Sequence, residues 1–233
     1  MVNVYLHGPE WFFGVDASLE TLATIIALFV AVASFKVYRM TREKKYAYFT
    51  ASFVLLTLSF LARALTDSLL EDVFDKIMGK HALTISQQYA PVLFFTGYVT
   101  HIFLALTAYV ILLLVTHKIT DKRLISLLFI MLIPSMLLSG SYFLSFYGLS
   151  IIFLGFITNA YYQNYRKICK LPSCLVFIAF LFLTIAQVLF LLEAVYKPLY
   201  VAAHVTQAAG YVVLLFALIR ILLKPRNSEE FRR

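Results

Sequence analysis

Long apolar runs alternate with short polar segments along the chain. A helix needs about 20 predominantly apolar residues to cross a hydrocarbon core of about 30 Å. Continuous apolar runs favour helices over the alternating strands of a membrane β-barrel. The pattern therefore predicts an all-α integral membrane protein with seven transmembrane helices, of which the fourth is the shortest. The runs cover approximately 18–37, 46–66, 90–116, 124–138, 141–162, 174–195 and 199–223.

Composition supports the same class. The chain is 62% hydrophobic and 14% charged, whereas soluble domains are about 45–50% apolar and about 25% charged. No long polar segment separates the runs, so residues 1–233 are predicted to form one domain. We expect a multi-pass protein of the cell membrane, with the lipid bilayer as its main partner.

The positive charges predict how the helices are oriented. Of the 20 Lys and Arg residues, only Lys76, Lys80 and Lys197 lie in loops that follow an even-numbered run, and Arg63 lies within the second run. The other sixteen lie near the first, third and fifth loops or in the basic tail 224–233. The positive-inside rule then places the N-terminus outside and the C-terminus inside. The net charge of +8 is thereby explained without nucleic acid, and the basic inner face could meet a cytoplasmic protein partner.

The chain also contains a weak internal repeat. Shifting residues 18–66 by 127 positions gives 11 identities in 49 positions, and the third run aligns with the seventh at Tyr98 with Tyr200 and Tyr109 with Tyr211. Similar composition can produce such matches by coincidence. Alternatively, two parallel three-helix repeats, about 18–116 and 141–223, are joined by a linker helix at about 124–138. Parallel repeats of this kind are a known transporter plan.

This three-plus-one-plus-three arrangement, with the N-terminus outside, resembles SWEET-type sugar transporters and microbial rhodopsins. The resemblance implies either small-solute transport or a retinal pigment. A retinal Schiff base requires a lysine midway along the last helix, and the sequence has none between Lys197 and Lys224. The proline usual in the first helix of each SWEET triplet is absent from 18–37 and 141–162. Retinal bound as a Schiff base is therefore not expected.

Six polar side chains lie at a similar depth in the predicted bundle. Counted at about 1.5 Å per residue from the basic loops, they lie about 20 to 27 Å towards the outside. Ionisable groups at membrane depth usually face a bundle interior or a wet cavity. We therefore expect an outward-facing pocket for a small-molecule ligand, which Tyr98, Tyr109, Tyr200 and Tyr211 could also line. The predicted ligand-binding residues are Glu20, Arg63, His101, Gln187, His204 and Gln207.

The same residues also fit simpler roles. Arg63 could pair with Asp67, four residues along the same helix, and extend to the outer surface. Glu20 could be a first-turn carboxylate favoured by the helix dipole. Each histidine could hydrogen-bond a neighbouring helix, as polar side chains in membranes often do.

Three functional classes remain open. The leading hypothesis is a sensor or receptor-like module that binds a ligand from the outside. The second is a SWEET-like small-solute transporter, whose site is expected near the membrane midplane. The third is a redox protein in which His101 and His204 ligate a haem iron or a metal ion. No cofactor is required by the sequence, and no Gly-x-Ser-x-Gly, His-Glu-x-x-His or phosphate-binding loop predicts an enzyme or names a catalytic residue.

Overall fold

A computed structural model describes residues 15–78, 86–137, 142–193 and 195–223. Within these residues the regular elements are all helices, and six of the seven are long and apolar enough to cross a membrane. These helices are compatible with the multi-pass membrane protein that the sequence predicts. The helices are α1 (Val15–Thr41), α2 (Lys44–Met78), α3 (Ser86–Thr116), α4 (Lys122–Leu137), α5 (Tyr142–Ile168), α6 (Leu171–Leu192) and α7 (Leu199–Leu223).

The fourth helix differs from the expectation of seven spanning helices. α4 has 16 residues, which corresponds to about 24 Å at about 1.5 Å per residue. This is short of the about 30 Å of a hydrocarbon core. α2 differs in the other direction, because its 35 residues continue well past the predicted end at residue 66. Polar residues ended the apolar run there without ending the helix.

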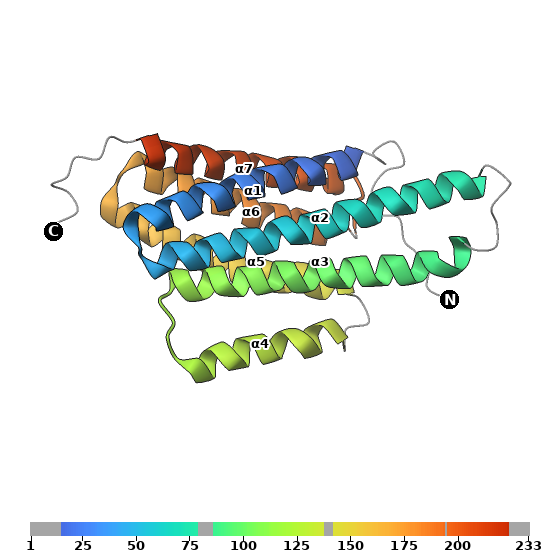
Figure 1. Cartoon of the computed structure of the whole chain (residues 1–233), viewed down its shortest axis with the longest axis horizontal. Helices are drawn as coiled ribbons and strands as arrows, with labels where there is room; N and C mark the ends of the chain where they lie inside the picture. The colour runs from blue at the N-terminus through green and yellow to red at the C-terminus, as the bar shows by residue number, and fades with distance from the viewer. Residues whose placement is uncertain (1–14, 79–85, 138–141, 194, 224–233) are drawn as a thin grey trace.

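Six helices form a closed ring. Each contacts its two neighbours in the order α1, α2, α3, α5, α6, α7, and α7 returns to α1. α4 contacts only α3 and α5 among these close pairs and lies apart from the ring (Figure 1). In the same view α1, α3 and α7 run in one direction and α2 runs in the other (Figure 1). The ring therefore encloses a single core.

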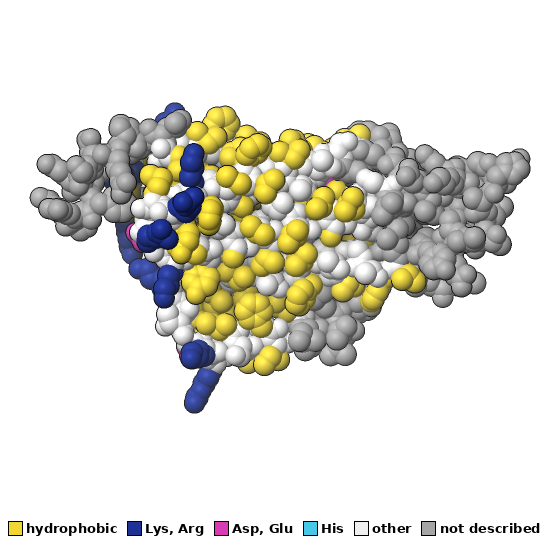
Figure 2. Space-filling view, viewed as in Figure 1, with side chains coloured by type: hydrophobic (Ala, Val, Ile, Leu, Met, Phe, Trp, Pro, Cys, Tyr) yellow, Lys and Arg dark blue, Asp and Glu magenta, His cyan; other side chains and the backbone are white. Residues whose placement is uncertain are grey.

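Large apolar side chains from all six ring helices fill the part of the core nearer the short α1–α2, α3–α4 and α5–α6 connections. Each ring helix contributes one side chain that is at most 1% exposed. We call these six the apolar layer: Val30, Phe53, Leu112, Ile157, Phe180 and Leu214. Each lies six to ten residues from a lysine or arginine near one end of its helix or just beyond it, or about 9 to 15 Å along the axis. The outside of the ring is also apolar, as expected for a lipid-facing surface (Figure 2).

Lysine and arginine gather at one end of the visible face (Figure 2). We call this the basic end, and the opposite end of the bundle the far end. The basic end holds the connections that follow α1, α3 and α5. Each of these has a residue with a positive φ angle in its first or second position, Arg42, Lys118 and Cys169, at 57°, 53° and 49°. A left-handed residue is a common way to end a helix. Which side of the membrane the basic end faces remains a prediction.

Candidate functional site

Arg63 is buried inside the far half of the bundle. Its side chain is 8% exposed, and its Nε lies 2.5 Å from Oε1 of Glu20, which is 4% exposed. Asp67 Oδ2 is farther from the same Nε, at 3.8 Å. The guanidinium also donates a hydrogen bond of 3.3 Å from Nη2 to the Tyr200 hydroxyl. Arg63 therefore faces an inter-helix partner and does not extend into lipid.

Two more tyrosines complete the surroundings of Arg63. Its Cζ lies 5.9 Å from the ring centre of Tyr98 on α3, a cation–π distance. Tyr147 on α5 interacts electrostatically with the guanidinium. Side chains from five of the six ring helices thus meet at Arg63. We call this group the Arg63 cluster: Glu20, Arg63, Asp67, Tyr98, Tyr147 and Tyr200.

Asp67 is held in place from the neighbouring helix. The Tyr98 hydroxyl donates a hydrogen bond of 2.8 Å to Asp67 Oδ1. Gly97 precedes Tyr98 on α3, and Thr66 precedes Asp67 on α2. The two helices approach so closely here that a Cβ added to Gly97 would overlap Thr66 Oγ1. A glycine permits this close approach of the backbone. The hydrogen bond between Tyr98 and Asp67 depends on that approach.

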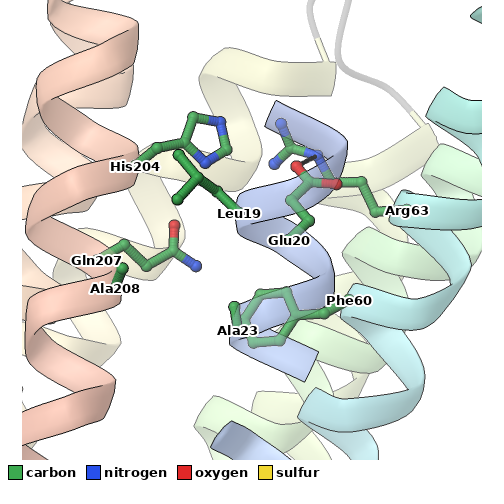
Figure 3. Close-up of a pocket in the computed structure, with 8 residues that line it drawn as sticks. All are labelled: Leu19, Glu20, Ala23, Phe60, Arg63, His204, Gln207 and Ala208. Carbon is green, nitrogen blue, oxygen red and sulfur yellow. Dashed lines mark ion pairs between the residues drawn. The ribbon is translucent and has the colours of Figure 1, made fainter. Parts of the chain in front are cut away.

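A small cavity lies beside the ion pair (Figure 3). Glu20 on α1, Arg63 on α2, and His204 and Gln207 on α7 form its polar wall. The volume of the cavity that the centre of a water molecule can occupy is about 10 Å³. This is enough for about one water molecule. A larger ligand would need α7 to move away from α1. The apolar part of the wall consists of Leu19, Ala23, Phe60 and Ala208.

The other two predicted site residues lie elsewhere. The described wall of the cavity does not include His101 or Gln187. His101 Nδ1 lies 2.8 Å from Ser59 Oγ and 3.1 Å from the Ser59 carbonyl oxygen, and Ser59 Oγ also donates to the His101 carbonyl at 2.9 Å. His101 thus joins α3 to α2. Gln187 is 3% exposed on α6, and its Oε1 has no hydrogen-bond partner among the described residues.

The two histidines have different neighbours. The His101 ring packs against Phe60 and Phe146, at 6.2 and 5.4 Å between ring centres. The His204 ring packs edge-on against Phe190 and Tyr200, at 4.9 and 4.5 Å. Within the described residues, no three His, Cys, Asp or Glu side chains are grouped as they would be around a metal ion. His204 therefore belongs with the cavity, and His101 with the packing of α2 on α3.

Some members of the site were not predicted. Tyr147 was not predicted as a site residue, because a tyrosine near a helix end is common at membrane interfaces. Glu193 follows α6, is 7% exposed and interacts electrostatically with Tyr147. The alignment of the repeats could have found Tyr147, which it places opposite Glu20.

Comparison with protein families, with characterised proteins and with solved structures found no match to the chain. The site must therefore be interpreted from its own geometry and chemistry.

Proposed function

We propose that the protein is a multi-pass, receptor-like membrane module that binds a small molecule at the cavity of the Arg63 cluster. The far end faces outside, the N-terminus is external, and the basic end is available to a cytoplasmic partner. One observation carries this proposal: a buried Arg63–Glu20 ion pair, 2.5 Å long, forms part of the wall of a cavity between α1, α2 and α7.

A purely structural role explains this ion pair poorly. Replacing a buried ion pair by packed apolar side chains is often neutral or stabilising by about 1–4 kcal/mol, because the charges lose their hydration. Ionisable side chains inside membranes are costly and usually mark a functional path or site. Glu20 and Arg63 are also joined by His204 and Gln207 at the same cavity. Four polar groups around one space favour a ligand.

The apolar layer favours sensing over transport. It lies between the Arg63 cluster and the basic end, and its six side chains are at most 1% exposed. A solute bound near Glu20 therefore has an apolar barrier beneath it. The buried hydroxyl groups near that level already bond within the bundle: Ser52 donates to the Tyr48 carbonyl, and Thr158 and Thr184 bond each other.

The parallel repeat is part of the proposal, and contacts between equivalent residues support it. The shift of 127 residues pairs Glu20 with Tyr147 and Arg63 with Phe190. Glu20 contacts Arg63 at 2.5 Å, and Tyr147 stacks on Phe190 at 5.2 Å with an interplanar angle of 8°. An ion pair in one half thus takes the place that a stacked aromatic pair takes in the other.

A second equivalent contact involves the third helix of each half. The shift of 102 residues pairs Tyr98 with Tyr200. Arg63 lies 5.9 Å from the Tyr98 ring, and Phe190 lies 5.9 Å from the Tyr200 ring. Chance similarity between apolar helices would reproduce burial but not these pairwise contacts.

The first helices of the two proposed repeats, α1 and α5, also end in the same way. Arg42 and Cys169 are 127 residues apart, and both have left-handed backbone angles. Their amides donate to the carbonyls of Tyr38 and Tyr165, at 2.7 and 2.8 Å. Because the Glu20–Arg63 ion pair occurs in only one half, the two repeats would form one site rather than two.

A second candidate function is small-solute transport. The observation in its favour is the position of the cavity at the contact of α1 with α7, where the two proposed repeats meet. Rocking of one repeat against the other would open this contact. The Arg63 cluster would then act as an outer gate.

The test begins with the full chain in lipid nanodiscs and a panel of amines, carboxylates, amino acids and sugars. A ligand should raise the unfolding temperature of the native protein. It should not raise the unfolding temperature of the His204→Leu variant. Thr206→Val is the matched control, since its side chain lies two residues along α7 and bonds its own helix at Ala202. Binding that His204→Leu leaves unchanged would contradict the proposed site. Saturable uptake of the ligand into proteoliposomes would favour transport, and not sensing, as the function.

A further inference from the structure

The buried charges of the bundle are unequal in sign. Arg63, Glu20 and Glu193 are the charged residues classed as buried among the described residues, and Asp67 is half-buried. The described interior thus holds one cation and three carboxylates. Two of these, Glu20 and Asp67, lie within 4 Å of Arg63 Nε, at 2.5 and 3.8 Å. Among the described residues, Arg63 and its two nearest carboxylates, Glu20 and Asp67, therefore carry a formal charge of −1 when all three are ionised.

The cavity wall supplies hydrogen-bond acceptors on two facing helices. His204 and Gln207 extend from α7 towards Glu20 on α1 (Figure 3). The Glu20 carboxylate, the Gln207 amide oxygen and a neutral His204 ring nitrogen can each accept a hydrogen bond. The space between them is about 10 Å³, which suits a group about the size of one water molecule.

We infer that the cavity binds the ammonium group of a primary amine. This group is about the size of a water molecule and has three N–H donors in tetrahedral directions, which matches three acceptors. It also cancels the excess negative charge beside Arg63. A simple carboxylate would raise that charge to −2. A quaternary ammonium has the right charge, but it has no N–H donor and is larger than the space. This inference rests on the proposed ligand-binding function and specifies its ligand.

Amine binding would also change which helices Arg63 connects. Its pair with Glu20 joins α2 to α1, whereas a pair with Asp67 remains within α2. An ammonium that pairs with Glu20 leaves Asp67 as the counter-ion of Arg63. The Tyr98 hydroxyl already holds Asp67 in place. The buried guanidinium then keeps a counter-ion throughout, and the ion pair that joins α1 to α2 is broken. Since a ligand shifts a conformational equilibrium by its different affinities for the two states, this exchange links amine binding to helix movement.

The test uses the full chain in lipid nanodiscs at constant ionic strength, with ethylammonium chloride, tetramethylammonium chloride and sodium acetate as probes. We expect ethylammonium to raise the unfolding temperature in a saturable way, and the other two to have no such effect. Gln207→Met should weaken ethylammonium binding about tenfold or more, because it removes an acceptor from a charged donor. Glu20→Gln should abolish binding. Gln163→Met, on the exposed surface of α5, should leave binding unchanged.

The outcomes separate this inference from the proposed function. Equal binding of tetramethylammonium, or tighter binding of acetate, would overturn the amine inference. So would full ethylammonium affinity in Gln207→Met, a variant that keeps the ion pair and decides the matter if Glu20→Gln does not fold. If a sugar or carboxylate binds instead and depends on His204, the amine inference fails while the receptor-like function stands. If no member of the wider panel binds, both fail.

Discussion

Removal of the Glu20 carboxylate tests whether Asp67 can replace it as the counter-ion of Arg63. Loss of one partner from a buried ion pair costs about 3–5 kcal/mol when the other charge is left uncompensated. Here Asp67 Oδ2 is already 3.8 Å from Arg63 Nε. A small side-chain movement would restore a charged hydrogen bond worth about 1.5–3 kcal/mol. We therefore expect Glu20→Gln to lower the free energy of unfolding by only about 1–2 kcal/mol.

The double variant should show the coupling. Asp67→Asn alone should cost about 1 kcal/mol, because Glu20 still holds Arg63 and an amide oxygen can still accept from Tyr98. When both carboxylates are removed, Arg63 has neither nearby counter-ion, so the loss should approach about 3–5 kcal/mol. The double variant should therefore exceed the sum of the single variants by at least about 1 kcal/mol, the range found for residues in one network.

Unfolding by increasing SDS fractions in mixed micelles, followed by far-ultraviolet circular dichroism, would measure these free energies. Glu43→Gln is the matched control, because Glu43 pairs with Lys45 at the surface, where their side chains are 41% and 57% exposed. Such a pair is worth at most about 1 kcal/mol. Additive single variants would refute the exchange of Arg63 between two carboxylates. A negligible effect of Glu20→Gln would show that Glu20 does not hold Arg63.

Two further predictions concern topology and packing. A reporter fused after Arg233 should be cytoplasmic and a tag before Val2 external; accessibility labelling that finds both on one side would contradict the proposed orientation. Gly97→Ala should destabilise the bundle by about 1–3 kcal/mol, the usual range for overpacking, because its Cβ would overlap Thr66 Oγ1. Gly155→Ala is the control, since a Cβ there meets no other atom within 4 Å, and an equal loss in both variants would contradict the close approach of α2 and α3.

The sequence predicts the position of a side chain along the bundle well, and its direction around the helix poorly. Six of the seven predicted runs are helices long and apolar enough to cross a membrane, and counting from the basic loops placed Glu20, Arg63, His204 and Gln207 at a similar level. These four do line one cavity. Depth follows directly from residue number, because a helix rises about 1.5 Å per residue. The rotation of each helix depends on its packing, which the sequence does not contain locally.

His101 illustrates this limit. It lies at nearly the same depth as His204, yet the repeat aligns His101 with Ala203. A difference of one residue rotates a side chain by about 100° around its helix, since a turn takes 3.6 residues. His101 consequently points to Ser59 on α2, and His204 points into the cavity. The choice of Arg63 between Glu20 and Asp67 depended in the same way on the distance between α1 and α2.

The proposed repeat offers a way to separate the stability of the Arg63 cluster from its function. The stacked pair Tyr147–Phe190 is the apolar counterpart of Glu20–Arg63 in the other half. Arg63→Phe alone should cost about 3–5 kcal/mol, because it leaves Glu20 buried without its counter-ion. Adding Glu20→Tyr should recover most of this loss, since the two aromatic rings can stack as their counterparts do, at 5.2 Å.

The double variant Glu20→Tyr/Arg63→Phe should then unfold at nearly the same SDS fraction as the native protein and bind no amine. Such a result would mean that the ion pair contributes ligand binding rather than stability, in agreement with the small net value of buried ion pairs. A double variant as unstable as Arg63→Phe alone would mean that the two positions do not have equivalent surroundings. The parallel repeat would then lose the contact pair on which it most depends.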